Sequence, residues 1–168
     1  MSLIVLCGPM FAGKTEGLID RTLRAGQAVR VYKPTVDTRH GGSSVLSHGG
    51  RSLPATWTTP DLHGVQPGGF VAIDEAQFLA PEAIEKVRVL IQHGTALVLA
   101  GLDLTYQGEP FGPMPAFLSM ADEVVKLKAR CSCGQPASRT FRKIAGGGVV
   151  LVGGAEAYEP RCLPCWTV

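Results

Sequence analysis

The eight residues from Gly8 to Thr15 constrain this chain more than any other feature. Their sequence, Gly-Pro-Met-Phe-Ala-Gly-Lys-Thr, fits the phosphate-binding loop pattern G-x-x-x-x-G-K-[ST] at every fixed position. The apolar run from Leu3 to Cys7 precedes the loop, as a buried parallel strand would. Residues 16–25 follow it and are expected to form a helix that ends at Gly26. A strand, a tight turn and a helix N-terminus place backbone N–H groups around one point, so the sequence predicts a phosphate site there.

Two side chains of the loop add chemistry to this backbone arrangement. Lys14 brings a mobile positive charge for the outer phosphates of a nucleoside triphosphate, and the Thr15 hydroxyl can ligate Mg²⁺. The predicted phosphate contacts are therefore Gly8, Pro9, Met10, Phe11, Ala12, Gly13, Lys14 and Thr15.

Length and composition favour one domain with a small appendage. The chain has 168 residues, of which 45% are hydrophobic, and this is enough for an ordinary core. It has no apolar run of about 18 residues and no basic segment at its start, so we expect a cytoplasmic protein without a membrane span or signal peptide. The net charge of +2 is too small to indicate a nucleic-acid partner by itself.

Strands and helices are expected to alternate along most of the chain. Further strands are expected at residues 28–32, 70–74, 95–100 and 124–128, and helices at 81–94 and 114–120. Residues 33–53 show no clear period and are expected to form a mobile connection. The fold class that follows is α/β, a P-loop parallel sheet flanked by helices, with its site at the carboxyl ends of the strands.

A pair of carboxylates, Asp74 and Glu75, ends the predicted strand at 70–74. P-loop proteins hold Mg²⁺ with an Asp at this position, so Asp74 joins Thr15 as a predicted magnesium position. Glu75 is then placed to act as the general base that accepts the proton of a phosphate acceptor. Two alternatives remain open: the acids can cap the next element, or Glu75 can orient water in an ATPase.

The loop at residues 101–112 suggests a pocket for a flat base. It carries Leu102, Tyr106 and Phe111 at the same end of the sheet as the phosphate-binding loop. The side chains of Met10, Phe11 and Phe78 can join them in a mostly apolar slot. Ordinary core packing is the alternative for each of these residues.

Four cysteines near the C-terminus form two close pairs. Cys131 and Cys133 make the first pair, and Cys162 and Cys165 make the second. Four thiolates are the number that a structural Zn²⁺ takes, and disulfides are the alternative. With short strands expected at residues 138–144 and 149–152, the chain is predicted to divide into domains at 1–130 and 131–168.

The remaining polar clusters carry no predicted chemistry. The four histidines have no metal spacing and are assigned to loops or solvent, and Cys7 is expected to be an inert core residue. Six basic residues are expected to form a solvated face, namely Lys126, Lys128, Arg130, Arg139, Arg142 and Lys143.

The motifs taken in order resemble the type II thymidine kinases. The resemblance rests on the phosphate-binding loop, Asp-Glu-Ala-Gln-Phe-Leu at 74–79, Gly-Leu-Asp-x-Thr-Tyr at 101–106, Pro-Phe-Gly at 110–112 and Gly-Gly-Ala-Glu-x-Tyr at 153–158. It implies transfer of the ATP γ-phosphate to the 5′-hydroxyl of thymidine, with Glu75 as the general base and Zn²⁺ in a structural site. It also implies a homotetramer, inhibition by the end product dTTP, and no nucleic-acid or membrane partner.

The resemblance assigns further residues to the substrates. Asp37 and Arg39 match a D-x-R motif, with Arg39 near the phosphates or the 5′-end. Residues around the base and sugar would be Met10, Leu102, Thr105, Tyr106 and Phe111, beside the Phe78 of the predicted apolar slot. The C-terminal unit would be a zinc-binding lasso domain, in which the backbone of Val149, Val150, Leu151, Val152 and Gly153 reads the thymine edge and Tyr158 contacts the substrate.

Three positions depart from the pattern of that family. The first cysteine pair is C-x-C where C-x-x-C is usual, Tyr106 replaces a common Phe, and Glu16 stands where a hydroxyl residue is common. Two other functions remain as alternatives, a P-loop ATPase without a nucleoside acceptor and a zinc-stapled nucleic-acid-binding module.

Overall fold

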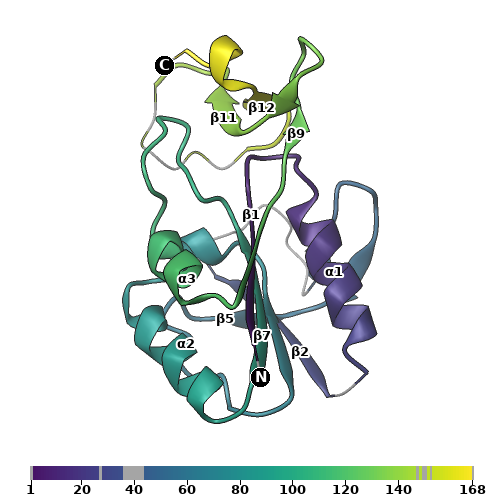
Figure 1. The fold of residues 1–168 in the computed structure, drawn as a ribbon, viewed down its shortest axis with the longest axis vertical. Helices are drawn as coiled ribbons and strands as arrows, with labels where there is room; N and C mark the ends of the chain where they lie inside the picture. Colours follow the sequence, from purple (N-terminus) through teal and green to yellow (C-terminus); the bar gives the residue numbers. More distant parts are fainter. Residues whose placement is uncertain are drawn as a thin grey trace.

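The central element of the molecule is a parallel sheet with helices on both faces (Figure 1). The structure is a computed structural model that describes residues 2–26, 28–35, 44–146, 148, 151 and 153–167. The sheet has six strands in the order β5-β2-β6-β7-β1-β8, and every neighbouring pair is parallel. Its strands are β1 (Leu3–Cys7), β2 (Val29–Pro34), β5 (Thr56–Thr58), β6 (Phe70–Ile73), β7 (Ala96–Gly101) and β8 (Glu123–Lys126).

Helices cover the two faces of the sheet and divide the core into two layers. Helix α1 (Lys14–Arg24) packs on one face through Leu18 and Ile19. Helices α2 (Glu82–Gln92) and α3 (Met114–Met120) pack on the other face. Strands β1, β6 and β7 are apolar along their length because both of their sides are covered. These elements confirm the predicted α/β sheet, with bounds shifted by one or two residues.

Strand order brings the predicted motifs to one edge. Strands β6, β7 and β1 are neighbours, and all three point the same way. The phosphate-binding loop follows β1, the carboxylate pair follows β6, and the loop starting at Leu102 follows β7. Three segments that are far apart in sequence therefore meet at the carboxyl edge of the sheet.

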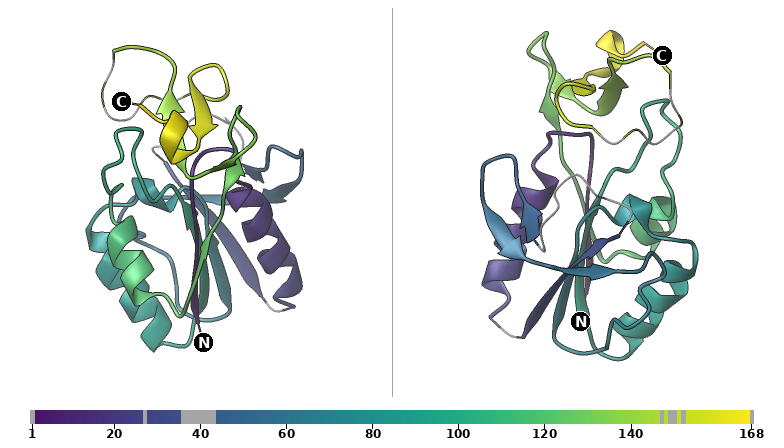
Figure 2. Two further views of the ribbon diagram at one scale, coloured as in Figure 1. Left: turned by 45° about the horizontal axis from the view of Figure 1, so that its top comes forward. Right: turned by 180° about the vertical axis from the view of Figure 1, so that it is seen from behind.

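A smaller unit of short strands lies beyond that edge, and all the views show it at the same end of the molecule (Figure 2). It contains two antiparallel pairs, β9 (Ala129–Arg130) with β10 (Pro136–Ala137) and β11 (Arg139–Arg142) with β12 (Tyr158–Arg161). A short 3₁₀ turn, η2 (Leu163–Cys165), follows β12. Its own apolar cluster is small, with Cys131, Ala137 and Cys162 as its buried members, so the unit needs a further staple.

The connection expected at residues 33–53 differs from the prediction in its second half. Residues 44–54 form an antiparallel hairpin of β3 (Ser44–Leu46) and β4 (Ser52–Pro54), and the parallel edge strand β5 follows. Strands of three residues are too short to show a period, which is why the pattern missed them. Val45 pairs with Leu53 and is buried beside α1, so packing stabilises the hairpin.

The strand expected at residues 149–152 falls mostly outside the described residues, because only Leu151 of that stretch is described. No helix in the described part of the chain is long and apolar enough to cross a bilayer.

Candidate active site

The phosphate-binding loop is shaped by two glycines with positive φ. Gly8 has φ 133°, and a Cβ atom there would lie 2.3 Å from the carbonyl oxygen of Leu127. Gly13 has φ 81° and is the N-cap of α1. Both conformations are rare for residues with side chains, so the pattern fixes glycine at these places for steric reasons.

Lys14 lies over this loop. Its ammonium Nζ donates a hydrogen bond of 2.7 Å to the carbonyl of Pro9. Burial lowers the pKa of Lys14, and the nearby carboxylates of Glu75 and Asp74 act in the opposite direction. The Lys14 cation and these two carboxylates therefore form one local electrostatic group at the edge of the sheet.

Asp74 is a buried carboxylate with two hydrogen-bond donors. The Thr15 hydroxyl donates to its Oδ2 over 3.0 Å, and the backbone N–H of Glu75 donates to its Oδ1 over 3.0 Å. Only 5% of the residue is exposed. Burial, followed by the charge of Glu75, raises the pKa of Asp74 to about 7, although the Thr15 hydrogen bond opposes the change. The structure therefore places the two predicted magnesium positions in direct contact.

Glu75 is oriented by a residue that sequence analysis missed. It has φ 54° and precedes the turn η1 (Ala76–Phe78), in which Gln77 is only 2% exposed. The Gln77 side chain donates from Nε2 to Glu75 Oε2 over 2.6 Å and accepts the Leu102 N–H at Oε1 over 3.0 Å. Gln77 thus links the carboxylate after β6 to the loop after β7. It lies inside the Asp-Glu-Ala-Gln-Phe-Leu motif, but that pattern alone does not reveal its partners.

A cavity of about 290 Å³ opens between these groups. Its lining includes most of the predicted phosphate-binding loop, both carboxylates, and three residues of the predicted apolar slot for a base, Met10, Phe11 and Leu102. The predicted residues that line it are Met10, Phe11, Gly13, Lys14, Thr15, Asp74, Glu75 and Leu102.

The β3–β4 hairpin supplies another wall of this cavity, which the sequence did not predict. Ser47, His48 and Gly49 line it, and the rings of His48 and Phe11 lie 4.8 Å apart. Arg51, at the base of the hairpin turn, forms ion pairs with Glu16 and Asp20 of α1. This contact explains Glu16, because its carboxylate helps to hold the hairpin against the helix that follows the phosphate-binding loop.

Other predicted substrate residues lie outside this cavity. Phe78 and Phe111 pack edge to face with ring centroids 5.7 Å apart. The Thr105 hydroxyl accepts the backbone N–H groups of Gln107 and Glu109 over 3.3 Å, which stabilises the loop after β7. Tyr106 lines a second cavity, of about 410 Å³, against the C-terminal unit.

The lasso residues are described only in part. The Tyr158 hydroxyl donates to the carbonyl of Leu151 over 2.7 Å, and Gly153 lies beside Ala157. Five predicted site residues lie outside the described residues: Asp37, Arg39, Val149, Val150 and Val152.

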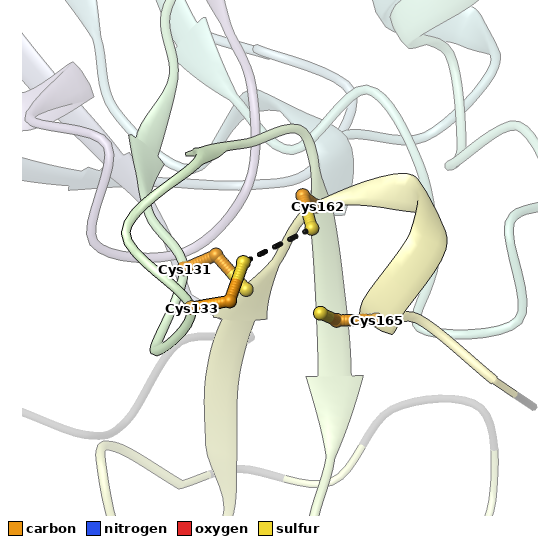
Figure 3. Close-up of side chains that lie close together, drawn as sticks. All are labelled: Cys131, Cys133, Cys162 and Cys165. Carbon is orange, nitrogen blue, oxygen red and sulfur yellow. Dashed lines mark hydrogen bonds between the residues drawn. The ribbon is translucent and has the colours of Figure 1, made fainter.

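The C-terminal cysteines converge on one point (Figure 3). Their four Sγ atoms all lie within 4.8 Å of one another, and those of Cys133 and Cys162 are 3.6 Å apart. Tetrahedral Zn²⁺ with bonds of about 2.3 Å needs sulfurs about 3.8 Å apart, so this donor set fits the ion. The C-x-C pair, Cys131 and Cys133, therefore places its sulfurs beside those of the C-x-x-C pair, Cys162 and Cys165, despite its shorter spacing.

The thiols of this cluster influence each other's ionisation. Backbone N–H groups of Cys133 and Cys162 lower the pKa of Cys131 to about 6. Contacts with the other three sulfurs raise the pKa of Cys165 to about 12. Cys7 differs, because burial raises its pKa to about 11 within the core, as expected of an inert residue.

The loop between β1 and α1, with a carboxylate at the end of a neighbouring parallel strand, makes this chain a P-loop nucleotide-binding protein. The family model for thymidine kinase matches residues 1–166, which is nearly the whole chain. The chain therefore belongs to the thymidine kinase family. Membership implies a kinase with ATP as the phosphate donor and thymidine as the acceptor.

Proposed function

We propose that this enzyme transfers the γ-phosphate of ATP to the 5′-hydroxyl of thymidine, giving dTMP and ADP, with Glu75 as the general base. One observation carries the proposal: Glu75 lines the same cavity as Lys14, Thr15 and Asp74. A base and a phosphate-binding loop that share one cavity allow the acceptor hydroxyl to meet the γ-phosphate in line.

The donor side of the site would bind the phosphates of ATP. Backbone N–H groups from Gly8 to Thr15 would cradle them, Lys14 would bind the outer oxygens, and Arg39 would assist. Thr15 and Asp74 would hold Mg²⁺, which neutralises phosphate charge when it is bound. The fit is supported by their oxygens, which already lie 3.0 Å apart, and by the buried carboxyl of Asp74, which a nearby cation would keep ionised.

Proton transfer is assigned to Glu75. As the 5′-oxygen attacks phosphorus, its proton passes to the carboxylate of Glu75. The hydrogen bond from Gln77 Nε2 fixes Oε2 of that carboxylate. The Gln77 side chain is itself held by the backbone N–H of Leu102, which lines the cavity. Gln77 therefore acts as a positioning residue that sets the distance between base and acceptor pocket.

The acceptor side is assigned to residues that surround the carboxyl end of β7. Met10 and Leu102 line the cavity itself, which supports a nucleoside between the phosphate loop and the β7 loop. The other proposed contacts are Asp37, Phe78, Thr105, Tyr106, Phe111, Tyr158 and the backbone of residues 149–153.

The C-terminal unit is proposed to be a zinc-binding lasso domain over residues 131–168, following a kinase domain over 1–130. Zinc would act as its staple, since the apolar cluster of the unit is small. We further propose a cytoplasmic homotetramer that serves nucleotide salvage and is inhibited by dTTP. These last properties rest on the family alone.

Product analysis tests the proposed reaction. The enzyme with MgATP and thymidine should release ADP and a nucleoside monophosphate in equal amounts, as measured by mass spectrometry. 3′-Deoxythymidine should remain a substrate, and 5′-deoxythymidine should not, because it lacks the attacking hydroxyl. ADP release at the full rate without any nucleoside would instead indicate an ATPase.

A further inference from the structure

Arg142 is buried at the junction between the two parts of the molecule. It is the last residue of β11, and only 8% of it is exposed, so the solvated face expected for the basic residues is wrong at this position. Its register partner in β12 is Tyr158, which places the two side chains next to each other on one side of the ladder.

The guanidinium of Arg142 contacts three separate segments. It stacks over the ring of Tyr106 in the loop after β7, with 4.3 Å from Cζ to the ring centroid. It donates from Nη2 to the Tyr158 hydroxyl over 3.2 Å, and from Nη1 to the carbonyl of Gly148 over 2.9 Å. Tyr158 in turn donates to the carbonyl of Leu151, so Arg142 contacts Gly148 directly and is linked to Leu151 through the Tyr158 hydroxyl.

The burial of the Arg142 charge without a carboxylate partner among the described residues would be costly for a residue that only fills space. Within the part of the chain that is described, no carboxylate pairs with Arg142, and its buried Nε has no hydrogen-bond partner. Burying an unpaired charge is costly, and carbonyl dipoles and ring faces offset only part of that cost. A planar cation can nevertheless stack on one ring while its edges reach a hydroxyl and a carbonyl, which an apolar side chain cannot do.

We propose that Arg142 is a positioning residue that fixes Tyr106 against Tyr158 and thereby sets the affinity for the nucleoside. The inference rests on the proposed function, because that assigns Tyr106 and Tyr158 to the acceptor pocket. Arg142 acts through these groups and takes no part in phosphoryl transfer. The ring of Tyr106 serves as the platform for the Arg142 cation in this arrangement.

Steady-state kinetics of Arg142→Met and Arg142→Lys test this role. The Met variant keeps an unbranched apolar stem but loses the guanidinium and its charge-assisted contacts, so the thymidine KM should rise by about 10-fold or more. The ATP KM and kcat should change by less than about threefold, because the donor half does not contact Arg142. The Lys variant should restore little of the thymidine affinity. An ammonium cannot stack on the Tyr106 ring and at the same time reach both the Tyr158 hydroxyl and the Gly148 carbonyl.

Arg139→Met is the matched control. Arg139 lies on the same strand and stacks on Trp166, with 5.8 Å from Cζ to the ring, but it does not contact Tyr106. Its thymidine KM should stay near that of the wild type. Equal rises in both KM values for Arg142→Met, or a wild-type thymidine KM for Arg142→Lys, would overturn the proposal.

A measurement without substrate separates this inference from the proposed function. Hydrogen exchange followed by mass spectrometry should be faster in Arg142→Met both for the peptide 143–158 and for the peptide 102–111, and unchanged for both in Arg139→Met. Unchanged exchange in Arg142→Met would refute the coupling, even in an enzyme that phosphorylates thymidine. Failure of the wild-type enzyme to phosphorylate thymidine would refute the proposed function, while exchange would still decide the coupling.

Discussion

Replacing Asp74 with Asn should raise the stability of the ligand-free protein relative to the wild type as the pH rises. Burial, followed by the charge of Glu75, raises the pKa of Asp74 from its ordinary 3.8 to about 7. Between these two pH values the folded chain keeps a proton that the unfolded chain has already lost. The wild-type protein therefore loses stability as the pH rises through this window, and the Asn variant does not.

The size of the effect follows from that window. The interval from 3.8 to about 7 corresponds to at most roughly 4 kcal/mol of unfolding free energy. Asn has one acceptor oxygen for two donors, the Thr15 hydroxyl and the Glu75 N–H, so it should lose about 1–3 kcal/mol at every pH. The constant loss cancels when the difference between variant and wild type is compared across pH.

Urea unfolding from pH 4.5 to pH 8 measures this difference. The unfolding free energy of Asp74→Asn minus that of the wild type should rise by up to about 3 kcal/mol between pH 4.5 and pH 8. Asp61→Asn is a matched carboxylate control, because hydrogen bonds from Thr59 and from the backbone N–H of His63 lower the pKa of Asp61 below its ordinary 3.8. Both the folded and the unfolded chain have lost this proton by pH 4.5, so the difference for Asp61→Asn should stay nearly flat up to pH 8. A flat or falling difference for Asp74→Asn would refute the reasoning.

Three further changes test other parts of the structure. Gly8→Ala should lower the melting temperature far more than Gly13→Ala in differential scanning calorimetry. Both glycines have positive φ, but only at Gly8 would the new Cβ also clash with the backbone of Leu127. Equal losses would contradict the close contact at Gly8. Gln77→Met should lower kcat about 10-fold or more with a smaller change in the ATP KM, since Glu75 loses the hydrogen bond from Gln77. An unchanged kcat would show that Gln77 does not position Glu75. Cys162→Ser should lose bound metal, and mass analysis that finds one Zn²⁺ per chain in that variant would contradict the cysteine site.

The sequence predicted the parts of the site that depend on local order. Gly8, Gly13, Lys14 and Thr15 form a contiguous loop, and Asp74 directly follows an apolar strand, so their placement needs only a strand, a turn and a helix. The alternation of strands and helices predicted the parallel sheet. The order of its strands places the phosphate-binding loop after β1 near the carboxylate pair after β6.

The contacts that the sequence missed depend on the packing of distant segments. The hairpin at residues 44–54 has strands of three residues, and its hold on α1 depends on Arg51 meeting Glu16 and Asp20. Gln77 and Arg142 are polar residues that are buried because each has partners on other elements. No periodicity records such pairs, so only a structure could locate them.

The most direct test of the account is the kinetics of Glu75→Gln. Glutamine keeps the size of the side chain and an acceptor for Gln77, but it cannot take up the proton of the 5′-hydroxyl. Glu109→Gln, an exposed change in the loop after β7, serves as the control. The account predicts that kcat for thymidine falls at least ~100-fold in Glu75→Gln, while MgATP binds as tightly as in the wild type. Near-normal turnover in that variant would contradict the assignment of Glu75 as the base.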